Sequence, residues 1–158
     1  MSLEDWLREG LLTEHRTSRQ EVGDLLAAVE RDLQDCDAEG LSADWRLAIA
    51  HNAVRGLATL ALAAEGYRPL RTAHHYRVVQ SLAHTVGAES GLIRELDALR
   101  KKRNLSEYER AGAVSNHEAD RAVVLARELH GCVSEWLSER HAELVEAEAE
   151  REPEAADE

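Results

Sequence analysis

The sequence lacks phenylalanine altogether, and it contains only two prolines and nine glycines in 158 residues. Residues that interrupt helices are therefore scarce, whereas alanine, leucine, glutamate and arginine, which are strong helix formers, are abundant. No segment shows the period-two alternation, bounded by turns, that is typical of a half-buried strand. The composition predicts an all-α protein, and the length suits one domain with a substantial core.

Cysteine is also nearly absent. Cys36 and Cys132 are far apart and match no metal-binding or redox spacing, so we expect two reduced, partly buried thiols. His74 and His75 are neighbours, but adjacent side chains on a helix point about 100° apart and do not chelate one ion together. No cysteine or carboxylate completes a ligand set beside them. The sequence therefore predicts no metal site and no cofactor.

Long apolar runs are missing as well. The longest near-apolar run, Gly56 to Ala64, is too short to cross a bilayer. The N-terminal segment, residues 1–6, is acidic and lacks the basic-then-apolar pattern of a signal peptide. We expect no membrane association and a cytoplasmic protein.

Positive charge is in short supply, since the net charge is −12. Residues 143–158 contain eight acids against one base, which gives −7 and leaves −5 for residues 1–142. Affinity for nucleic-acid backbones rests on lysine and arginine, so general nucleic-acid binding is excluded and RNA contact is confined to a local basic patch. We expect one domain over residues 1–149 and an acidic, disordered tail over residues 150–158.

The chain does contain strong helical patterns, with candidate N-terminal caps at Ser18, Ser42 and Ser115. They predict an antiparallel up-and-down bundle of about five helices, with the helix that starts at Ser42 at its centre. The expected helices span residues 18–36, 42–65, 72–86, 91–103 and 116–148, after a short helix over residues 2–8. Gly66 to Pro69 is expected to be a turn, and the core is expected to contain Trp45, Leu57, Leu60, Leu96 and Leu129.

The most informative stretch is a run of four cations, Arg100 to Arg103, at the end of an amphipathic pattern. Leu92, Leu96 and Leu99 recur at helical spacing, and Arg103 continues their stripe. A guanidinium on a core-facing line is costly unless it meets an anion, a partner chain or a cleft. The alternative is a solvated basic helix end, which complements the helix dipole.

A helix that ends in Leu99-x-x-x-Arg103-Asn104, with an aromatic residue about one turn later, resembles the HEPN domain family. That motif is an arginine, usually followed by a polar residue, with a histidine four to six residues further on. Tyr108 takes the place of the histidine here, and Arg110 with His117 forms a rival pair. The resemblance implies a small helical protein, often a homodimer, and in many members a metal-independent ribonuclease toxin.

Under this resemblance, Arg103, Asn104 and Tyr108 are the candidate catalytic residues. The candidate residues for RNA or nucleotide binding are Arg100, Lys101, Lys102, His51 and Arg55. His51, Asn52 and Arg55 interrupt an apolar surface, so they either form a satisfied buried network or line the cleft beside Arg103.

Three classes of function remain open from the sequence. The first is an endoribonuclease of toxin–antitoxin or defence type that works as a homodimer. The second is a non-catalytic HEPN module that binds RNA, a nucleotide, or a partner such as a small nucleotidyltransferase or an antitoxin. The third is a helical scaffold whose basic patch has no ligand.

Overall fold

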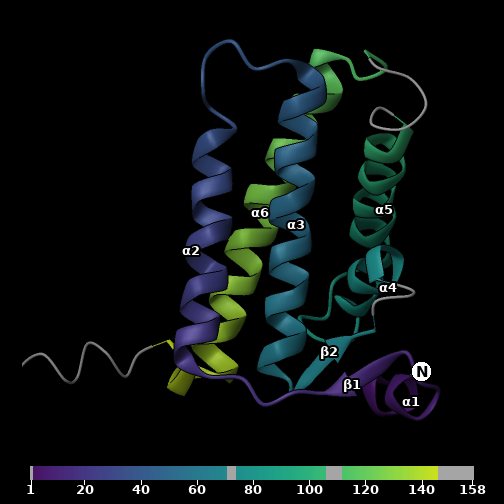
Figure 1. Ribbon diagram of the computed structural model, residues 1–158, viewed down its shortest axis with the longest axis vertical. Coiled ribbons are helices and arrows are strands. Elements are labelled where there is room, and N and C mark those ends of the chain that lie inside the picture. Colours follow the sequence, from purple (N-terminus) through teal and green to yellow (C-terminus); the bar gives the residue numbers. More distant parts are fainter. Residues whose placement is uncertain (1, 71–73, 106–111, 146–158) are drawn as a thin grey trace, which may run out of the picture.

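The computed structural model describes residues 2–70, 74–105 and 112–145 (Figure 1). These residues form an all-α bundle with one very small sheet. The elements are, in order, α1 (Leu3–Arg8), β1 (Leu12–Glu14), α2 (Arg19–Asp35), α3 (Ala43–Ala64), β2 (Tyr67–Pro69), α4 (His74–Ser81), α5 (Ser90–Asn104), α6 (Asn116–Arg140) and a short 3₁₀ turn, η3 (Ala142–Leu144). Tyr108 and the expected disordered tail over residues 150–158 lie outside the described residues.

Serine side chains begin the long helices, as the sequence predicts. Ser18, Ser42 and Ser115 each accept a hydrogen bond from the backbone N–H three residues later, at 3.1 Å in all three cases. Each bond satisfies one of the N–H groups that the first turn of a helix leaves without an intrahelical partner. Local sequence therefore fixes where α2, α3 and α6 start.

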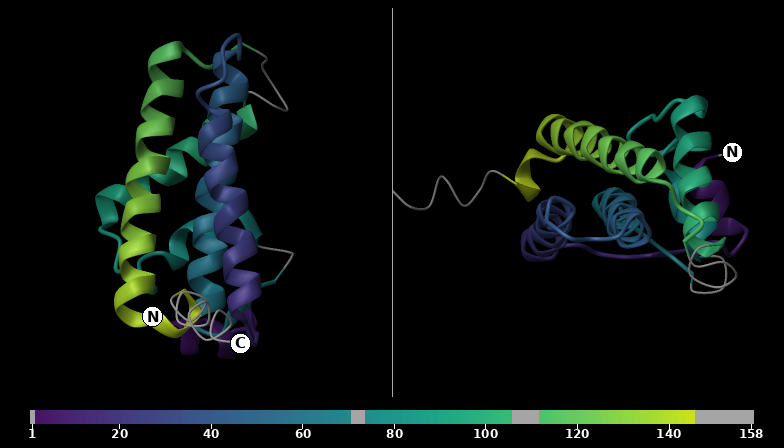
Figure 2. Two further views of the ribbon diagram at one scale, coloured as in Figure 1. Left: turned by 90° about the vertical axis from the view of Figure 1, so that its left-hand side faces the viewer. Right: turned by 90° about the horizontal axis from the view of Figure 1, so that it is seen from above.

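Helix α3 is the central element, because α2 and α6 pack on it from one side and α4 and α5 from the other (Figures 1 and 2). Eleven of its residues are buried. By length and composition alone α3 could cross a membrane, but 61% of that apolar window is buried inside the fold, as in the core helix of a soluble protein. The predicted central position of this helix is confirmed.

One side of α3 is not buried. Between Leu47 and Ala63 the residues that retain solvent exposure are Ala48, Ile49, Asn52, Arg55, Gly56 and Thr59, and Trp45 continues this series toward the start of the helix. Spacings of three and four residues place this whole series on one side of a helix. We call Trp45, Ala48, Ile49, Asn52, Arg55, Gly56 and Thr59 the open strip of α3.

The core contains the expected leucines but not the expected tryptophan. Leu57, Leu60, Leu96 and Leu129 have no exposed surface. The prediction for Trp45 was wrong, because its side chain is 64% exposed. Trp45 lies in the first turn of α3 and on the open strip, whereas the buried series of this helix begins at Leu47.

The segment expected to be a turn, Gly66 to Pro69, instead contains a strand. β1 and β2 pair antiparallel, with Leu12 opposite Pro69 and Glu14 opposite Tyr67. Each strand has three residues, which is too short for a period-two pattern to be recognised in the sequence. Gly66, at a φ of 95°, turns the chain out of α3 and into β2.

Two helices end earlier than predicted. α4 stops at Ser81 rather than residue 86, because backbone bonds from Leu82, Ala83 and His84 to the third residue before each tighten the chain out of α-helical geometry. α6 stops at Arg140 rather than residue 148, since the backbone of His141 is no longer helical.

Candidate functional site: two guanidinium groups between α3 and α5

The last turn of α5 carries the basic run, and its core-facing side is apolar up to Arg103. Leu96 has no exposed surface and Leu99 is also buried. Arg103 follows Leu99 by four residues, which places it on the same side of the helix, and it is half-buried. The expected position of Arg103 on the buried stripe is confirmed.

Arg55 of α3 lies close enough to Arg103 for the two charges to act on each other. The pKa of Arg55 falls below its ordinary value, first because the group is partly buried and second because of the positive charge of Arg103. Its Nε atom is buried without a hydrogen-bond partner in the described part of the chain. Within that same part, no carboxylate forms an ion pair with Arg55. We call these two residues the Arg55–Arg103 site.

The sequence left two interpretations open for His51, Asn52 and Arg55, namely a satisfied buried network or the lining of a cleft beside Arg103. The structure gives different answers for different members of this group. The side-chain amide of Asn52 donates to Asp32 Oδ2 at 2.8 Å, so Asn52 belongs to a network between α2 and α3. His51 is one turn before Arg55 and is only 1% exposed. Arg55 lies within electrostatic reach of Arg103 of α5, whereas Asn52 has a structural role.

The other cations of the basic run are held by nearby acids. Arg100 Nε lies 2.7 Å from Asp97 Oδ1, and Lys101 Nζ lies 3.5 Å from Asp97 Oδ2. Asp97 thus neutralises part of this charge within α5. Asn104, the last residue of α5, is half-buried directly after Arg103.

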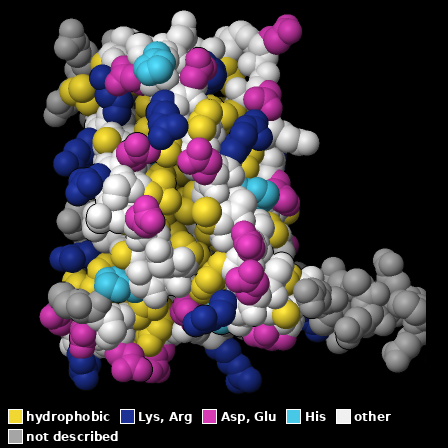
Figure 3. Space-filling view, turned by 180° about the vertical axis from the view of Figure 1, so that it is seen from behind, with side chains coloured by type: hydrophobic (Ala, Val, Ile, Leu, Met, Phe, Trp, Pro, Cys, Tyr) yellow, Lys and Arg dark blue, Asp and Glu magenta, His cyan; other side chains and the backbone are white. Residues whose placement is uncertain are grey.

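Lys102 belongs to a different surface of α5. Its Nζ atom lies 3.2 Å from Glu118 Oε2 of α6, and it lines a pocket of about 250 Å³ with Leu47, Leu99 and other residues of α3, α5 and α6. Figure 3 shows the molecule from behind, where an apolar band runs down the middle of the face with charged side chains along it. The structure therefore separates Lys102 from the Arg55–Arg103 site.

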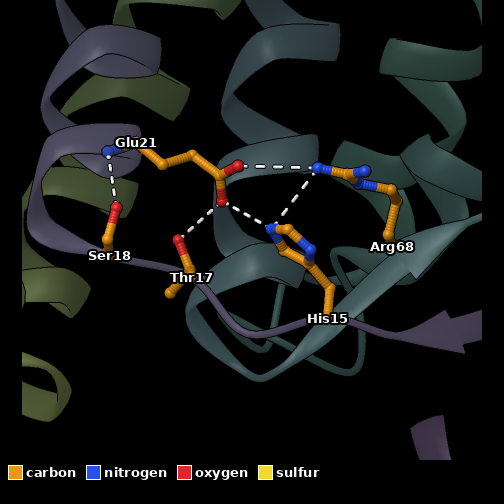
Figure 4. Close-up of polar contacts among 5 residues, drawn as sticks. All are labelled: His15, Thr17, Ser18, Glu21 and Arg68. Carbon is orange, nitrogen blue, oxygen red and sulfur yellow. Dashed lines mark hydrogen bonds and ion pairs between the residues drawn. The ribbon is translucent and has the colours of Figure 1, made fainter.

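A second cluster of charged side chains lies beside the C-terminal end of α3, and the sequence analysis did not identify it (Figure 4). His15 Nε2 lies 2.7 Å from Glu21 Oε1, and the hydroxyl of Thr17 donates to the same oxygen at 2.7 Å. Arg68 of β2 approaches the other carboxylate oxygen at 3.5 Å. We call these four residues the His15–Glu21 cluster.

The charges of the His15–Glu21 cluster compensate one another. The pKa of Glu21 falls below its ordinary value, first because Thr17 donates to the carboxylate and then because His15 does. A carboxylate only accepts, so the 2.7 Å contact requires a proton on His15 Nε2. The arrangement ties α2 to the segment before it and to the sheet, which is a structural role.

The sequence around this cluster predicted a cap at Ser18, and Glu21, three residues later, also has the spacing of a reciprocal capping box. Only half of that motif forms, because Ser18 accepts from the Glu21 backbone while the Glu21 side chain turns to His15 and Thr17. The complete reciprocal box forms at Ser115 and Glu118. Spacing alone could not distinguish the two cases.

Both cysteines are free thiols, Cys36 buried and Cys132 exposed. Across residues 2–70, 74–105 and 112–145, no three histidines, cysteines or carboxylates are grouped to hold a metal ion. No family model, curated protein or solved structure matches this chain.

Proposed function

We propose that the Arg55–Arg103 site binds a phosphate group of RNA, and that the protein is a metal-independent endoribonuclease of the toxin–antitoxin or defence type implied by its HEPN-like motif. The observation that supports binding is the approach of two half-buried guanidinium groups of like charge, one of which has no acidic partner among the described residues. An anion between them would offset both the burial and the repulsion. Guanidinium groups also match phosphate oxygens in a two-bond fork.

Cleavage would use Arg103, Asn104 and Tyr108. In metal-free RNA cleavage the 2′-oxygen attacks phosphorus as a base takes its proton, and the bond to the 5′-oxygen breaks. The 5′-oxygen takes a proton from water as it leaves, so the products are a 2′,3′-cyclic phosphate and a 5′-hydroxyl. Arg103 would stabilise the charge on the phosphorus centre, and Asn104 would orient it. Tyr108 would be the base. A phenol has an ordinary pKa of about 10, and nearby guanidinium groups would lower it.

The HEPN-like motif also carries a proposal about assembly. We expect a homodimer in which the cleft at Arg103 is shared with the second chain, because two sites brought together would add cations around Tyr108. A small nucleotidyltransferase or an antitoxin is the proposed partner. Light scattering at high micromolar concentration tests the dimer, and a monomeric mass there contradicts it.

Binding without cleavage is the second candidate function, and it is favoured by the tyrosine that stands where the motif has histidine. A tyrosine ring positions RNA by stacking or by a hydrogen bond and needs no change of protonation. In that case the same two arginines hold the phosphate, and the ligand is RNA or a nucleotide that leaves unchanged.

Three variants test the proposal. Each is incubated with mixed RNA in excess EDTA, and binding is measured in parallel. We expect Arg103→Leu to lose both binding and cleavage while it stays folded, because a partly buried charge is exchanged for packing. Tyr108→Phe should lose cleavage and keep binding, and Tyr108→His should raise cleavage.

The outcomes separate the three classes of function. An Arg103→Leu protein that binds and cleaves like the parent shows that the basic run is a solvated helix end of a scaffold protein. A parent that binds but does not cleave, with Tyr108→Phe unchanged in affinity, identifies the non-catalytic module.

A further inference from the structure

Trp45 is the most exposed large apolar side chain among the described residues, at 64%. The other two tryptophans are in contact with rings or cations. Trp6 is 5% exposed, with the His84 ring at 5.2 Å and the Arg77 guanidinium 5.9 Å from its centroid. Trp136 packs against the His141 ring at 4.9 Å. Exposing a tryptophan leaves a large apolar area in water, which is unfavourable unless something covers it.

The open strip of α3 connects Trp45 to the Arg55–Arg103 site. Asn52 follows Trp45 by seven residues and so lies on the same side of the helix, and Arg55 follows Asn52 by three. Ten residues of α-helix place Arg55 about 15 Å from Trp45 along the axis. Lys102, in the last turn of α5, lines one pocket with Leu47, so the end of α5 lies beside α3 at a level between Trp45 and Arg55.

A flat ring at one end of a strip and a cationic site further along it match the chemistry of a single-stranded nucleic acid. Such ligands bind through bases stacked on aromatic rings and through a backbone that follows positive charge. At about 3.4 Å per stacked nucleotide, 15 Å corresponds to about four nucleotides. A protein partner is the less favoured occupant, because it supplies no reason for a half-buried arginine without a carboxylate partner, Arg55, on the same side of α3 as an exposed tryptophan.

We infer that Trp45 is a base-stacking residue, and that a single strand of RNA runs along the open strip of α3 from Trp45 to the Arg55–Arg103 site. The inference rests on the proposed function, because it uses the same phosphate site. It adds a binding residue that the HEPN-like motif does not contain, and it sets a minimum ligand length.

The test uses the full chain with 2′-O-methyl hexaadenylate, which spans both contacts and lacks the 2′-hydroxyl needed for cleavage. Tryptophan fluorescence and anisotropy of a labelled strand are followed together. We expect the hexanucleotide to quench the parent's fluorescence, and Trp45→Ala to weaken binding by about 5- to 150-fold. Trp45→Phe, which keeps a ring, should lose less. Tripolyphosphate, which has no base, should bind the parent and Trp45→Ala equally.

Val124→Ala is the matched control, because Val124 is an exposed apolar residue of α6, at 44%. It should bind the hexanucleotide like the parent. If Arg55→Leu weakens binding but Trp45→Ala does not, stacking is refuted while the phosphate site stands. If the parent binds neither ligand, the proposed function itself fails. If Trp45→Ala only lowers the molar mass in light scattering, Trp45 contacts a protein and the inference is overturned.

Discussion

The His15–Glu21 cluster, beside the C-terminal end of α3, and the Arg55–Arg103 site, at the middle of α3, contain similar kinds of side chains in opposite arrangements. In the His15–Glu21 cluster, one carboxylate accepts from a histidine and a hydroxyl at 2.7 Å and lies 3.5 Å from an arginine. In the Arg55–Arg103 site, two positive charges lie close enough for the charge of Arg103 to lower the pKa of Arg55. The first arrangement contains its own counter-charge, whereas Arg55 in the second has no carboxylate partner among the described residues.

Residue type alone does not show whether a group of charged side chains contains its own counter-charge. A compensated cluster stabilises the fold, because every polar group that leaves water finds a partner. A partly buried guanidinium with no carboxylate partner, such as Arg55 within the described residues, costs stability in the absence of a ligand. Natural chains retain such costs mainly at sites that bind or react. The contrast therefore predicts that mutations in the His15–Glu21 cluster lower stability, whereas mutations in the Arg55–Arg103 site weaken ligand binding.

The largest expected effect on RNA binding comes from exchanging one arginine for leucine in each of the two sites, Arg55 in the Arg55–Arg103 site and Arg68 in the His15–Glu21 cluster. Arg55→Leu should weaken RNA binding by about 10- to 100-fold, the range for a charge-assisted hydrogen bond. Its free energy of unfolding should stay equal or rise, because burial no longer opposes a charge. Arg68→Leu should leave RNA binding unchanged. It should cost under about 1 kcal/mol of stability, since Arg68 is 58% exposed.

Anisotropy with labelled RNA and urea unfolding measure the two properties on the same samples. If both variants lose the same amount of RNA affinity, the proposed difference between the two sites is refuted, because a general effect of net charge would then explain the loss.

A second contrast concerns how tightly α3 is held beside its open strip. A Cβ atom at Gly56 would meet Val29 Cγ2 at 2.8 Å, whereas nothing lies within 4 Å of a Cβ at Gly131 of α6. Gly56→Ala gains about 1 kcal/mol of helix propensity but overpacks a stiff β-branched neighbour at a cost of about 1–3 kcal/mol. Gly131→Ala gains the same helix propensity without a cost of overpacking. Thermal or urea unfolding should show Gly56→Ala less stable than Gly131→Ala, and equal stability would mean that α2 moves freely away from α3.

A smaller effect should appear in the pH dependence of stability at the His15–Glu21 cluster. The pKa of Glu21 is lowered in the folded protein, so its contribution is full above the unfolded pKa of about 4.3 and is lost as the pH falls through the folded value. Glu21→Gln removes this titration. Urea unfolding should therefore show the parent more stable near pH 7, with the difference shrinking below about pH 4. A difference that is constant with pH would mean that Glu21 acts only through neutral hydrogen bonds.

The smallest expected effect is on the melting temperature after truncation behind Ala149. The removed residues contain five acids and one base, with no large apolar side chain to bury. The melting temperature should not change, and RNA affinity at low salt should rise slightly as repulsion is removed. A clear drop in melting temperature would show that this segment packs on the bundle.

Features that depend on near neighbours in the chain could be predicted well. Ser18, Ser42 and Ser115 marked three helix starts, because a cap bond joins residues three positions apart. The stripe of Leu96 and Leu99 identified Arg103 as core-facing, because helical periodicity repeats within a few residues. Helix ends were harder to predict. α4 ends at tighter backbone hydrogen bonds and α6 ends at a non-helical backbone conformation, and neither end coincides with a glycine or proline.

The sequence by itself determined an all-α chain, its helix starts, its apolar stripes and a basic run that interrupts one of them. Only the tertiary structure decided that Arg55 lies within electrostatic reach of Arg103, that Trp45 faces solvent, and that His15 lies near Arg68, 53 positions away. Such pairings depend on how far and at what angle helices and strands approach one another. Those distances are set by packing across the whole core, which no local window of residues contains.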